Sequence, residues 1–173
     1  MSSIQTDMDS FQSQLVKGSI QRAYRALLAY MLALRSQFAS KYGEPAVSAL
    51  YQGYMDMTYF ALFPPSLKCL DLKIAIVFNY DAFRFEAWLA ARNRKVQRQY
   101  WELFKNNDWA EYRVVAPAAG IDSILECDLA KDFDLSKPDA LTSSIEMTTV
   151  AFIDKIERFL SEQQPHEGAT SCS

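Results

Sequence analysis

The chain has 173 residues, of which 50% are hydrophobic and 13% aromatic, and its formal net charge is −3. This length and hydrophobic content predict one globular domain with a core of its own, and they exclude a disordered chain. Acids and bases are mixed along the sequence, so the charge favours neither nucleic acid nor an anionic membrane as a partner.

The sequence predicts a cytoplasmic protein. Its first residues carry Asp7 and Asp9 and contain no apolar segment typical of a secretory signal. No apolar run approaches the roughly 20 residues needed to cross a bilayer. The cysteines Cys69, Cys127 and Cys172 are odd in number and far apart, which predicts free thiols in a reducing compartment.

A long helix is predicted over residues 19–42, because apolar residues recur there every three or four positions. They are Ile20, Tyr24, Leu27, Met31, Leu34 and Phe38. Gly18 followed by Ser19 indicates a break and an N-cap, and Gly43 indicates the end. Residues 7–16 are expected to form a separate short helix.

The middle of the chain predicts strands. Residues 51–63 are rich in aromatics and end at Pro64-Pro65, residues 72–79 are apolar and β-branched, and residues 83–89 alternate. Two further strands are expected at 112–116 and 123–129.

A hairpin with a two-residue loop at Tyr80-Asp81 would sort the side chains of its strands cleanly. Phe78 would face Phe83 on an apolar side. The opposite side would pair Val77 with Arg84, Ala75 with Glu86, and Lys73 with Trp88. Because side chains alternate between the faces of a strand, a slip of one residue would scramble this separation.

Two more helices complete the prediction, over residues 93–106 and from about 138 to 162, the first capped by Asn93. Residues 1–163 are expected to form a single domain, followed by a disordered tail over residues 164–173. The predicted fold class is α+β, with an antiparallel sheet of about four or five strands packed by long N-terminal and C-terminal helices.

The composition excludes several common chemistries. The only histidine is His166, in the predicted tail, so a Ser-His or Cys-His nucleophile and a zinc hydrolase site are not expected. None of the five glycines forms a phosphate-binding loop. The sequence therefore predicts no catalytic residues, no metal and no cofactor.

A candidate ligand-binding face remains on the polar side of the hairpin. We expect Tyr54 and Asp56 to be brought there by the preceding strand, and Arg92 to follow at the strand-to-helix turn. The predicted ligand-binding residues are Tyr54, Asp56, Lys73, Arg84, Glu86, Trp88 and Arg92. A groove of paired charges and aromatics would suit a small polar ligand or a protein partner. The alternative is an ordinary solvated or helix-covered sheet face, which is the more common arrangement.

A metal-dependent phosphodiesterase is the second hypothesis, with Asp56 and Glu86 as paired carboxylates. The expected acid followed by Glu-x-Lys is incomplete, because Trp88 stands where the lysine belongs. Lys73 would substitute only if the hairpin register holds. The basic run over residues 92–98 is explained by a solvated helix face, so a nucleic acid partner is not expected.

The segment Tyr-Gln-Gly-Tyr-Met-Asp-Met-Thr-Tyr-Phe over residues 51–60, with residues 72–78 and 84–90, resembles a bacterial family described as domain of unknown function 7000. The resemblance covers residues 11–160 and implies a standalone cytoplasmic bacterial protein without an assigned activity. The run from Ile74 to Phe104 is more distantly similar to restriction-endonuclease-like domains that have lost catalytic residues, an analogy that does not fix function. The preferred prediction is a non-catalytic binding module, compatible with a homodimer.

Overall fold

The computed structural model describes residues 3–43 and 46–163. Along the chain lie α1 (Ile4–Val16), α2 (Ser19–Tyr42), β1 (Met57–Leu62), α3 (Pro65–Lys68), β2 (Leu72–Asn79), β3 (Arg84–Ala91), α4 (Arg94–Asn106), β4 (Arg113–Val114), β5 (Ser123–Ala130) and α5 (Pro138–Gln163). The strands form one antiparallel sheet in the order β1-β2-β3-β5-β4. The predicted α+β class is confirmed. The predicted tail over residues 164–173 lies outside the described residues.

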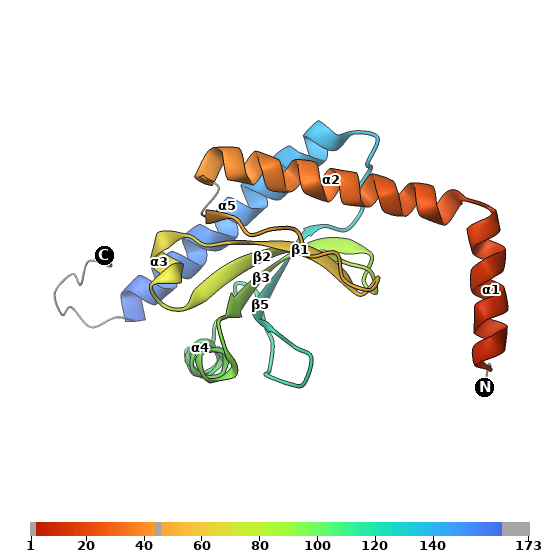
Figure 1. The fold of residues 1–173 in the computed structure, drawn as a ribbon. Helices are drawn as coiled ribbons and strands as arrows, with labels where there is room; N and C mark the ends of the chain where they lie inside the picture. The colour runs from red at the N-terminus through yellow and green to blue at the C-terminus, as the bar shows by residue number, and fades with distance from the viewer. Residues whose placement is uncertain (1–2, 44–45, 164–173) are drawn as a thin grey trace.

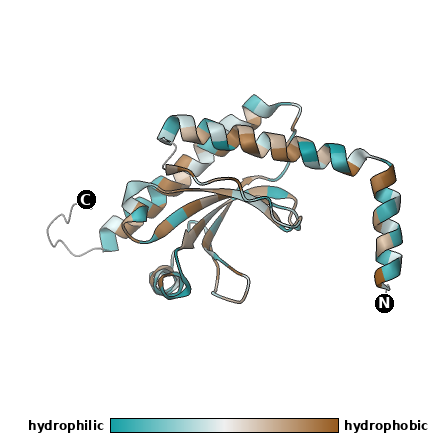
Figure 2. Cartoon of the chain, in the orientation of Figure 1, coloured by the Kyte–Doolittle hydropathy of each residue, from teal (hydrophilic) through white to brown (hydrophobic). Residues whose placement is uncertain are grey.

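One face of the sheet carries the hydrophobic core. The long helices α2 and α5 cross this face (Figure 1), and hydrophobic and hydrophilic residues alternate around both helices (Figure 2). The strands contribute alternate residues to the core, namely Phe60, Leu62, Ile74, Ile76, Phe78, Phe85, Ala87, Leu89, Leu125, Cys127 and Leu129. This period of two is what places the opposite set of side chains on the other face.

Helix α4 lies on the side of the sheet away from α2 (Figure 1). Its start is fixed by Asn93, whose side chain accepts a hydrogen bond from the amide of Val96 at 3.0 Å, as predicted. Its far end reaches the C-terminal helix, because Phe104 stacks on Phe159 of α5 with ring centroids 4.8 Å apart.

The start of α2 differs in detail from the prediction. The helix begins at Ser19, but its N-cap is Gly18, at φ 72°, and no side chain caps it. The expected side-chain cap by Ser19 is therefore wrong, although the break at Gly18 and the end at Gly43 are confirmed.

The predicted register of the β2–β3 hairpin is wrong by two residues. The turn spans the four residues 80–83, so Phe78 pairs with Phe85 and Val77 with Glu86. A shift of two leaves every side chain on its predicted face, because side chains alternate with a period of two. The separation of apolar from polar residues therefore survives the error in the turn.

The first predicted strand is shorter than expected. Strand β1 begins at Met57, while residues 51–56 form a bridge and a tight turn in front of it. Within this segment only Tyr51 pairs with the strand, through a bridge to Tyr59. The other aromatic residue of this segment, Tyr54, lies in the turn and not in a strand ladder.

The cysteines are not all free thiols. Cys127 is buried and free, but Cys69 is disulfide-bonded, so the prediction of a free thiol at Cys69 is wrong. Cys172 lies outside the described residues. A disulfide is not expected in a reducing cytosol, and the cytoplasmic location stays a prediction. Among the described helices, none combines the length and apolar character needed to span a bilayer.

Candidate functional site

The sheet face opposite the core, here called the polar face, brings together four of the predicted residues. Lys73 on β2 and Arg84, Glu86 and Trp88 on β3 all project from it, as the strand pairing requires. Their cross-strand partners differ from those predicted: Trp88 lies opposite Ala75 and Lys73 lies opposite Ala90.

Glu86 is the centre of a hydrogen-bond network on the polar face. Its carboxylate is fully buried. It accepts hydrogen bonds from Arg84 Nε at 2.6 Å, from Trp88 Nε1 at 2.8 Å and from Asn79 Nδ2 at 3.3 Å. A buried carboxylate is tolerated when its oxygens are paired and hydrogen-bonded in this way. The network uses the acceptor oxygens of Glu86 internally.

Arg84 connects this network to the next strand. Its Nε also lies 3.0 Å from Asp128 Oδ1 on β5, and Lys131 Nζ lies 2.9 Å from the other oxygen of Asp128. The hydrogen bond to Glu86, helped by the charges of both acids, raises the pKa of Arg84 above its ordinary value. This guanidinium therefore stays charged at every physiological pH.

A second group of polar contacts, centred on Glu126, lies beside the network of Glu86 and was not predicted from the sequence. Glu126 on β5 pairs with Trp88 across the sheet, accepts a hydrogen bond from Ser123 Oγ at 2.6 Å and forms a salt bridge with Arg113 of β4. The signal available was the alternation over residues 123–130, which places Glu126 and Asp128 on one face. The polar face thus places acids and bases around Trp88, beside the buried apolar Ala75 and Val77.

The structure does not bring Tyr54 and Asp56 to the polar face. Tyr54 is almost fully exposed in the turn before β1. The Asp56 carboxylate accepts a hydrogen bond from the amide of Tyr54 at 2.8 Å. Thr58, which shares the parity of Asp56, is buried on the core side with Phe60.

Arg92, the last of the predicted ligand-binding residues, follows β3. It forms an exposed pair with Asp71 at 3.4 Å. Exposed pairs of this kind contribute little to stability. Because the Arg92 side chain is 76% exposed, its guanidinium is accessible from solvent beside the polar face.

The two carboxylates of the phosphodiesterase hypothesis lie apart. Asp56 precedes β1 and Glu86 lies on β3, with β2 between them, so the two strands lie about 10 Å apart. Glu86 is in line with Tyr59 of β1, three residues beyond Asp56, which adds about 10 Å along the strand. Asp56 is held by its own turn, and Glu86 by Arg84, Asn79 and Trp88. Within the described residues, no three metal-ligating side chains are grouped in a way that could hold an ion. The geometry therefore gives this hypothesis no support.

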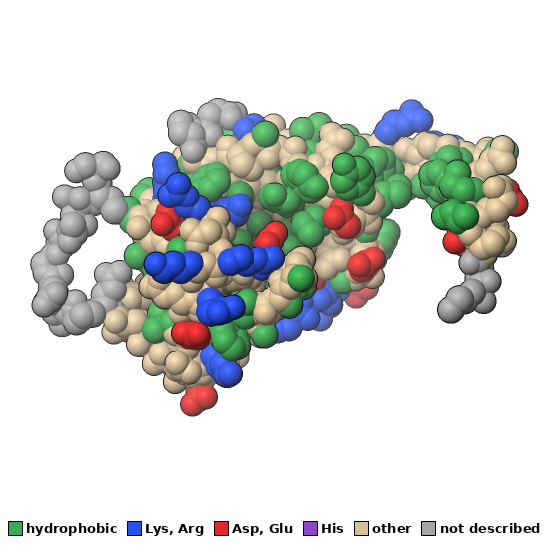
Figure 3. Space-filling view, turned by 60° about the horizontal axis from the view of Figure 1, so that its bottom comes forward, with side chains coloured by type: hydrophobic (Ala, Val, Ile, Leu, Met, Phe, Trp, Pro, Cys, Tyr) green, Lys and Arg blue, Asp and Glu red, His purple; other side chains and the backbone are tan. Residues whose placement is uncertain are grey.

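Basic side chains gather on the side of the molecule where α4 lies (Figure 3). Arg94, Lys95 and Arg98 line a shallow depression on α4 together with Gln99 and Glu102. Arg94 is partly engaged, because its guanidinium donates to the carbonyl of Ile121 and lies 3.6 Å from Asp122. The acids interspersed here match the solvated helix face expected from the sequence.

A pocket that the sequence analysis missed opens on the other side of the sheet. This α5 pocket has a volume of about 340 Å³, and its walls come from the end of α2, the end of β1, the start of α3 and α5. It is lined by Tyr42, Ala46, Leu62, Phe63, Pro64, Pro65, Val150, Ile153, Asp154 and Glu157. These segments are far apart in the sequence, so no local pattern signals the pocket.

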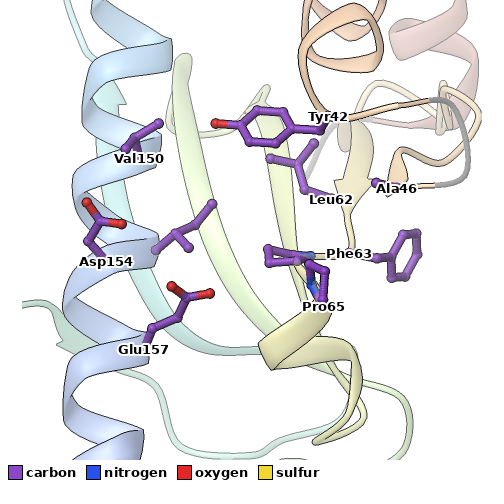
Figure 4. Close-up of a pocket in the computed structure, with 10 residues that line it drawn as sticks. Tyr42, Ala46, Leu62, Phe63, Pro65, Val150, Asp154 and Glu157 are labelled. Atoms are coloured by element: carbon purple, nitrogen blue, oxygen red, sulfur yellow. The ribbon is translucent and has the colours of Figure 1, made fainter. Parts of the chain in front are cut away.

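The polar groups of the α5 pocket are few and lie at its edge. In Figure 4 the carboxylate of Glu157 points across the pocket toward Pro65, whereas that of Asp154 lies along α5. The hydroxyl of Tyr42 points toward α5. Ser66 Oγ donates a hydrogen bond to Oε1 of Glu157, which leaves Oε2 as an acceptor. The ten described lining residues include no base.

Comparisons with curated proteins and with solved structures found no match. The distant similarity to restriction-endonuclease-like domains is therefore not supported by a structural relative. The model of a protein family described as domain of unknown function, DUF7000, matches residues 4–160, which include every strand and nearly all of α5. The chain belongs to the DUF7000 family.

Proposed function

We propose that this protein is a non-catalytic binding module that holds a small ligand in the α5 pocket. The ligand class is a compact apolar molecule that carries one positively charged, hydrogen-bond-donating group such as an ammonium. The observation that carries the proposal is an apolar pocket with a single inward carboxylate, that of Glu157.

The size of the pocket supports a small-molecule ligand. Its volume of about 340 Å³ lies at the lower end of the ~300–1,000 Å³ typical of ligand sites. Such sites are mostly apolar and contain a few polar groups that orient the ligand. Leu62 and Ile153 provide buried apolar surface, and Pro64 and Pro65 form a wall with little conformational freedom.

The charge of the pocket supports a cation. Glu157 is half-buried and points into the pocket, and Asp154 adds a second negative charge one turn earlier on α5. An ammonium beside Oε2 of Glu157 would form a charge-assisted hydrogen bond, which is stronger than a neutral one. The Tyr42 hydroxyl offers a further acceptor or donor on the opposite side.

The polar face supports a structural role better than a ligand site. The oxygens of Glu86 are occupied by Arg84, Asn79 and Trp88, so a ligand would have to displace an internal donor. Ligand binding by Lys73, Arg84, Glu86, Trp88 and Arg92 stays a prediction, and the same titrations test it.

The experiment is a titration of ¹⁵N-labelled protein with hexylammonium and phenethylammonium, and with the corresponding neutral alcohols. We expect amide shifts at Leu62 and Val150, and affinity for each ammonium about tenfold or more above that for its alcohol, as a charged hydrogen bond implies. Glu157→Gln should remove this preference. Glu162→Gln, in the exposed last turn of α5, is the matched control and should keep it.

Two results would contradict the proposal. Silence of the pocket amides with every cationic probe would reject the α5 pocket as a ligand site. Equal binding of ammonium and alcohol, unchanged by Glu157→Gln, would reject the ligand class. Shifts confined to Lys73, Trp88 and their neighbours would move the site to the polar face.

A further inference from the structure

We infer that two copies of this chain associate by exchanging their N-terminal helices, with α1 of each copy bound in an apolar groove of the other. The groove, here called the arm groove, lies beneath the first half of α2 at the turn end of the β2–β3 hairpin. The inference is independent of the ligand proposed above and concerns a different surface.

Helix α1 carries an apolar stripe that its own chain leaves uncovered. Ile4, Met8, Phe11 and Leu15 follow the spacing of one helical face. No residue of α1 is buried, and Ile4, Met8 and Phe11 are 78%, 53% and 49% exposed. The helix projects from the body as an arm (Figure 1), with hydrophobic residues at both of its ends (Figure 2). An isolated helix of 13 residues is marginal in water and is normally stabilised by packing its apolar face.

The arm groove offers a matching surface on the same chain. It has a volume of about 300 Å³. Its lining is almost entirely apolar and consists of Ile20, Ala23, Tyr24, Ala26, Leu27, Met55, Phe78, Tyr80, Phe83, Phe133 and Leu135. Aliphatic and aromatic side chains from α2, strand β2, two turns and a loop thus form a trough open to solvent, the kind of surface that receives an amphipathic helix.

The rim of the groove is held in place by strained backbone. Met55 and Phe83 both have positive φ, at 61° and 50°, a region that non-glycine residues enter at a cost. Both side chains are nevertheless exposed, at 45% and 65%. The ring of Phe83 contacts Phe78 and Phe133, with centroids 5.5 Å and 5.8 Å away. Large exposed apolar side chains at two strained turn positions are explained if another segment packs over them.

The elbow between α1 and α2 argues that the occupant is a second copy. Gly18 turns the chain with φ 72°, and its amide donates to the carbonyl of Leu15 at 2.9 Å. Gln21 Nε2 donates to the same carbonyl at 2.8 Å, which ties the end of α1 to the first turn of α2. The arm held by this clamp projects away from the body of its own chain (Figure 1), so a chain would have to break the clamp to fill its own groove.

The charges of the two helices lie outside the apolar contact, and symmetry allows the exchange to close. Helix α1 contains Asp7 and Asp9 and no base, and the first half of α2 carries Arg22 and Arg25, which do not line the groove. Both arginines are exposed. Helical spacing places both arginines on the side of α2 away from Ile20 and the groove, so a docked arm has apolar surroundings. Two identical contacts related by a two-fold axis close into a dimer and leave neither arm nor groove unpaired.

The test uses the full chain and measures its mass by light scattering during size-exclusion chromatography over a range of concentrations. We expect a dimer for the wild type and a monomer for Phe11→Asp, with a dissociation constant raised at least about tenfold by loss of two buried aromatic contacts. Ser13→Asp, on the opposite side of α1, adds the same charge and should stay dimeric. Circular dichroism should show that these variants keep the folded body, because no residue of α1 is buried.

A second variant separates exchange between chains from other arrangements. Phe83→Asn alters the groove, and asparagine tolerates positive φ, so the turn should still form. Phe11→Asp and Phe83→Asn should each be monomeric alone. Their mixture should form heterodimers, because the arm of the Phe83→Asn chain and the groove of the Phe11→Asp chain are both intact. A monomeric wild type, a dimer insensitive to both substitutions, or a mixture that stays monomeric would each overturn the inference.

Discussion

The indole of Trp88 donates a hydrogen bond to the carboxylate of Glu86, two residues earlier on the same face of β3, at 2.8 Å. Arg84, two residues earlier again, donates to the other oxygen of that carboxylate at 2.6 Å. Three alternate residues of one strand therefore form a single network, in which the buried charge of Glu86 is balanced by a guanidinium whose side chain is mostly buried. This part of the network is local in sequence, and Asn79 of β2 and Asp128 of β5 extend it to the neighbouring strands.

Glu86→Gln tests the weight of this network. The amide keeps the shape of the carboxylate but loses its charge, and it brings its own donor toward Arg84, Asn79 or Trp88. We expect the free energy of unfolding to fall by about 2–4 kcal/mol, because a buried hydrogen-bonded charge pair is broken. Urea unfolding followed by tryptophan fluorescence measures the change.

The matched control for that change is Asp128→Asn, which removes the exposed partner of the same arginine. A solvent-exposed pair is worth about 0–1 kcal/mol, so this variant should unfold close to the wild-type urea midpoint. Equal losses for the two substitutions would show that burial of Glu86 does not set the strength of the network.

The faces of the hairpin were predictable from the sequence, but its turn was not. Alternation over residues 72–79 and 84–91 fixes which side chains share a face, and this sorting is unchanged by a shift of two. The turn has no glycine to mark it. It contains Phe83 at positive φ, whose ring packs against Phe78 and Phe133. A tertiary contact, invisible in the local sequence, therefore decides the length of the turn.

The same reason explains the errors at Tyr54 and Asp56. Aromatic residues favour strands, yet residues 52–56 fold into a turn closed by the Asp56 carboxylate and by Thr58 Oγ1, which donates to the carbonyl of Gln52 at 2.8 Å. The α5 pocket could not be predicted at all, because its polar edge joins Ser66 to Glu157, 91 positions away. Local sequence patterns predict helices and the face on which each strand residue lies. Sites built from segments far apart in the sequence can be located only in the folded structure.

Gly53 should be far less tolerant of substitution than Gly120, although both have positive φ. A Cβ on Gly53 would lie 2.1 Å from the carbonyl oxygen of Met57 and 2.4 Å from Asp56 Oδ1, whereas a Cβ on Gly120 would meet nothing within 4 Å. Gly120→Ala should therefore lose only the conformational cost of about 1–2 kcal/mol. Gly53→Ala should lose about 1–3 kcal/mol more, because backbone must move.

Chemical denaturation of the two alanine variants under identical conditions makes this comparison. Because both substitutions add one methyl group at a left-handed residue, the difference between them isolates the steric clash. Similar unfolding free energies would mean that the turn before β1 relaxes freely, and that the position of Met55 at the arm groove is not fixed by this turn.

The turn at Asp56 should also make stability depend on pH. Hydrogen bonds from the amides of Tyr54 and Met57 stabilise the charged carboxylate and lower the pKa of Asp56 below its ordinary value of 3.8. A carboxyl whose pKa is lower in the folded state stabilises the fold above the pKa of the unfolded chain, and this stabilisation is lost as the pH falls through the folded-state pKa. The wild type should therefore lose stability relative to Asp56→Asn below about pH 4, since asparagine binds no proton there.

Urea midpoints of both proteins at pH 6, 4 and 3 measure the effect, and NMR titration of the Asp56 carboxyl locates the pKa itself. The shift should persist at high salt, because it arises from hydrogen bonds rather than from distant charges. A carboxyl that titrates at or above 3.8, or a stability difference that does not change with pH, would show that these amides do not hold the charged form of Asp56.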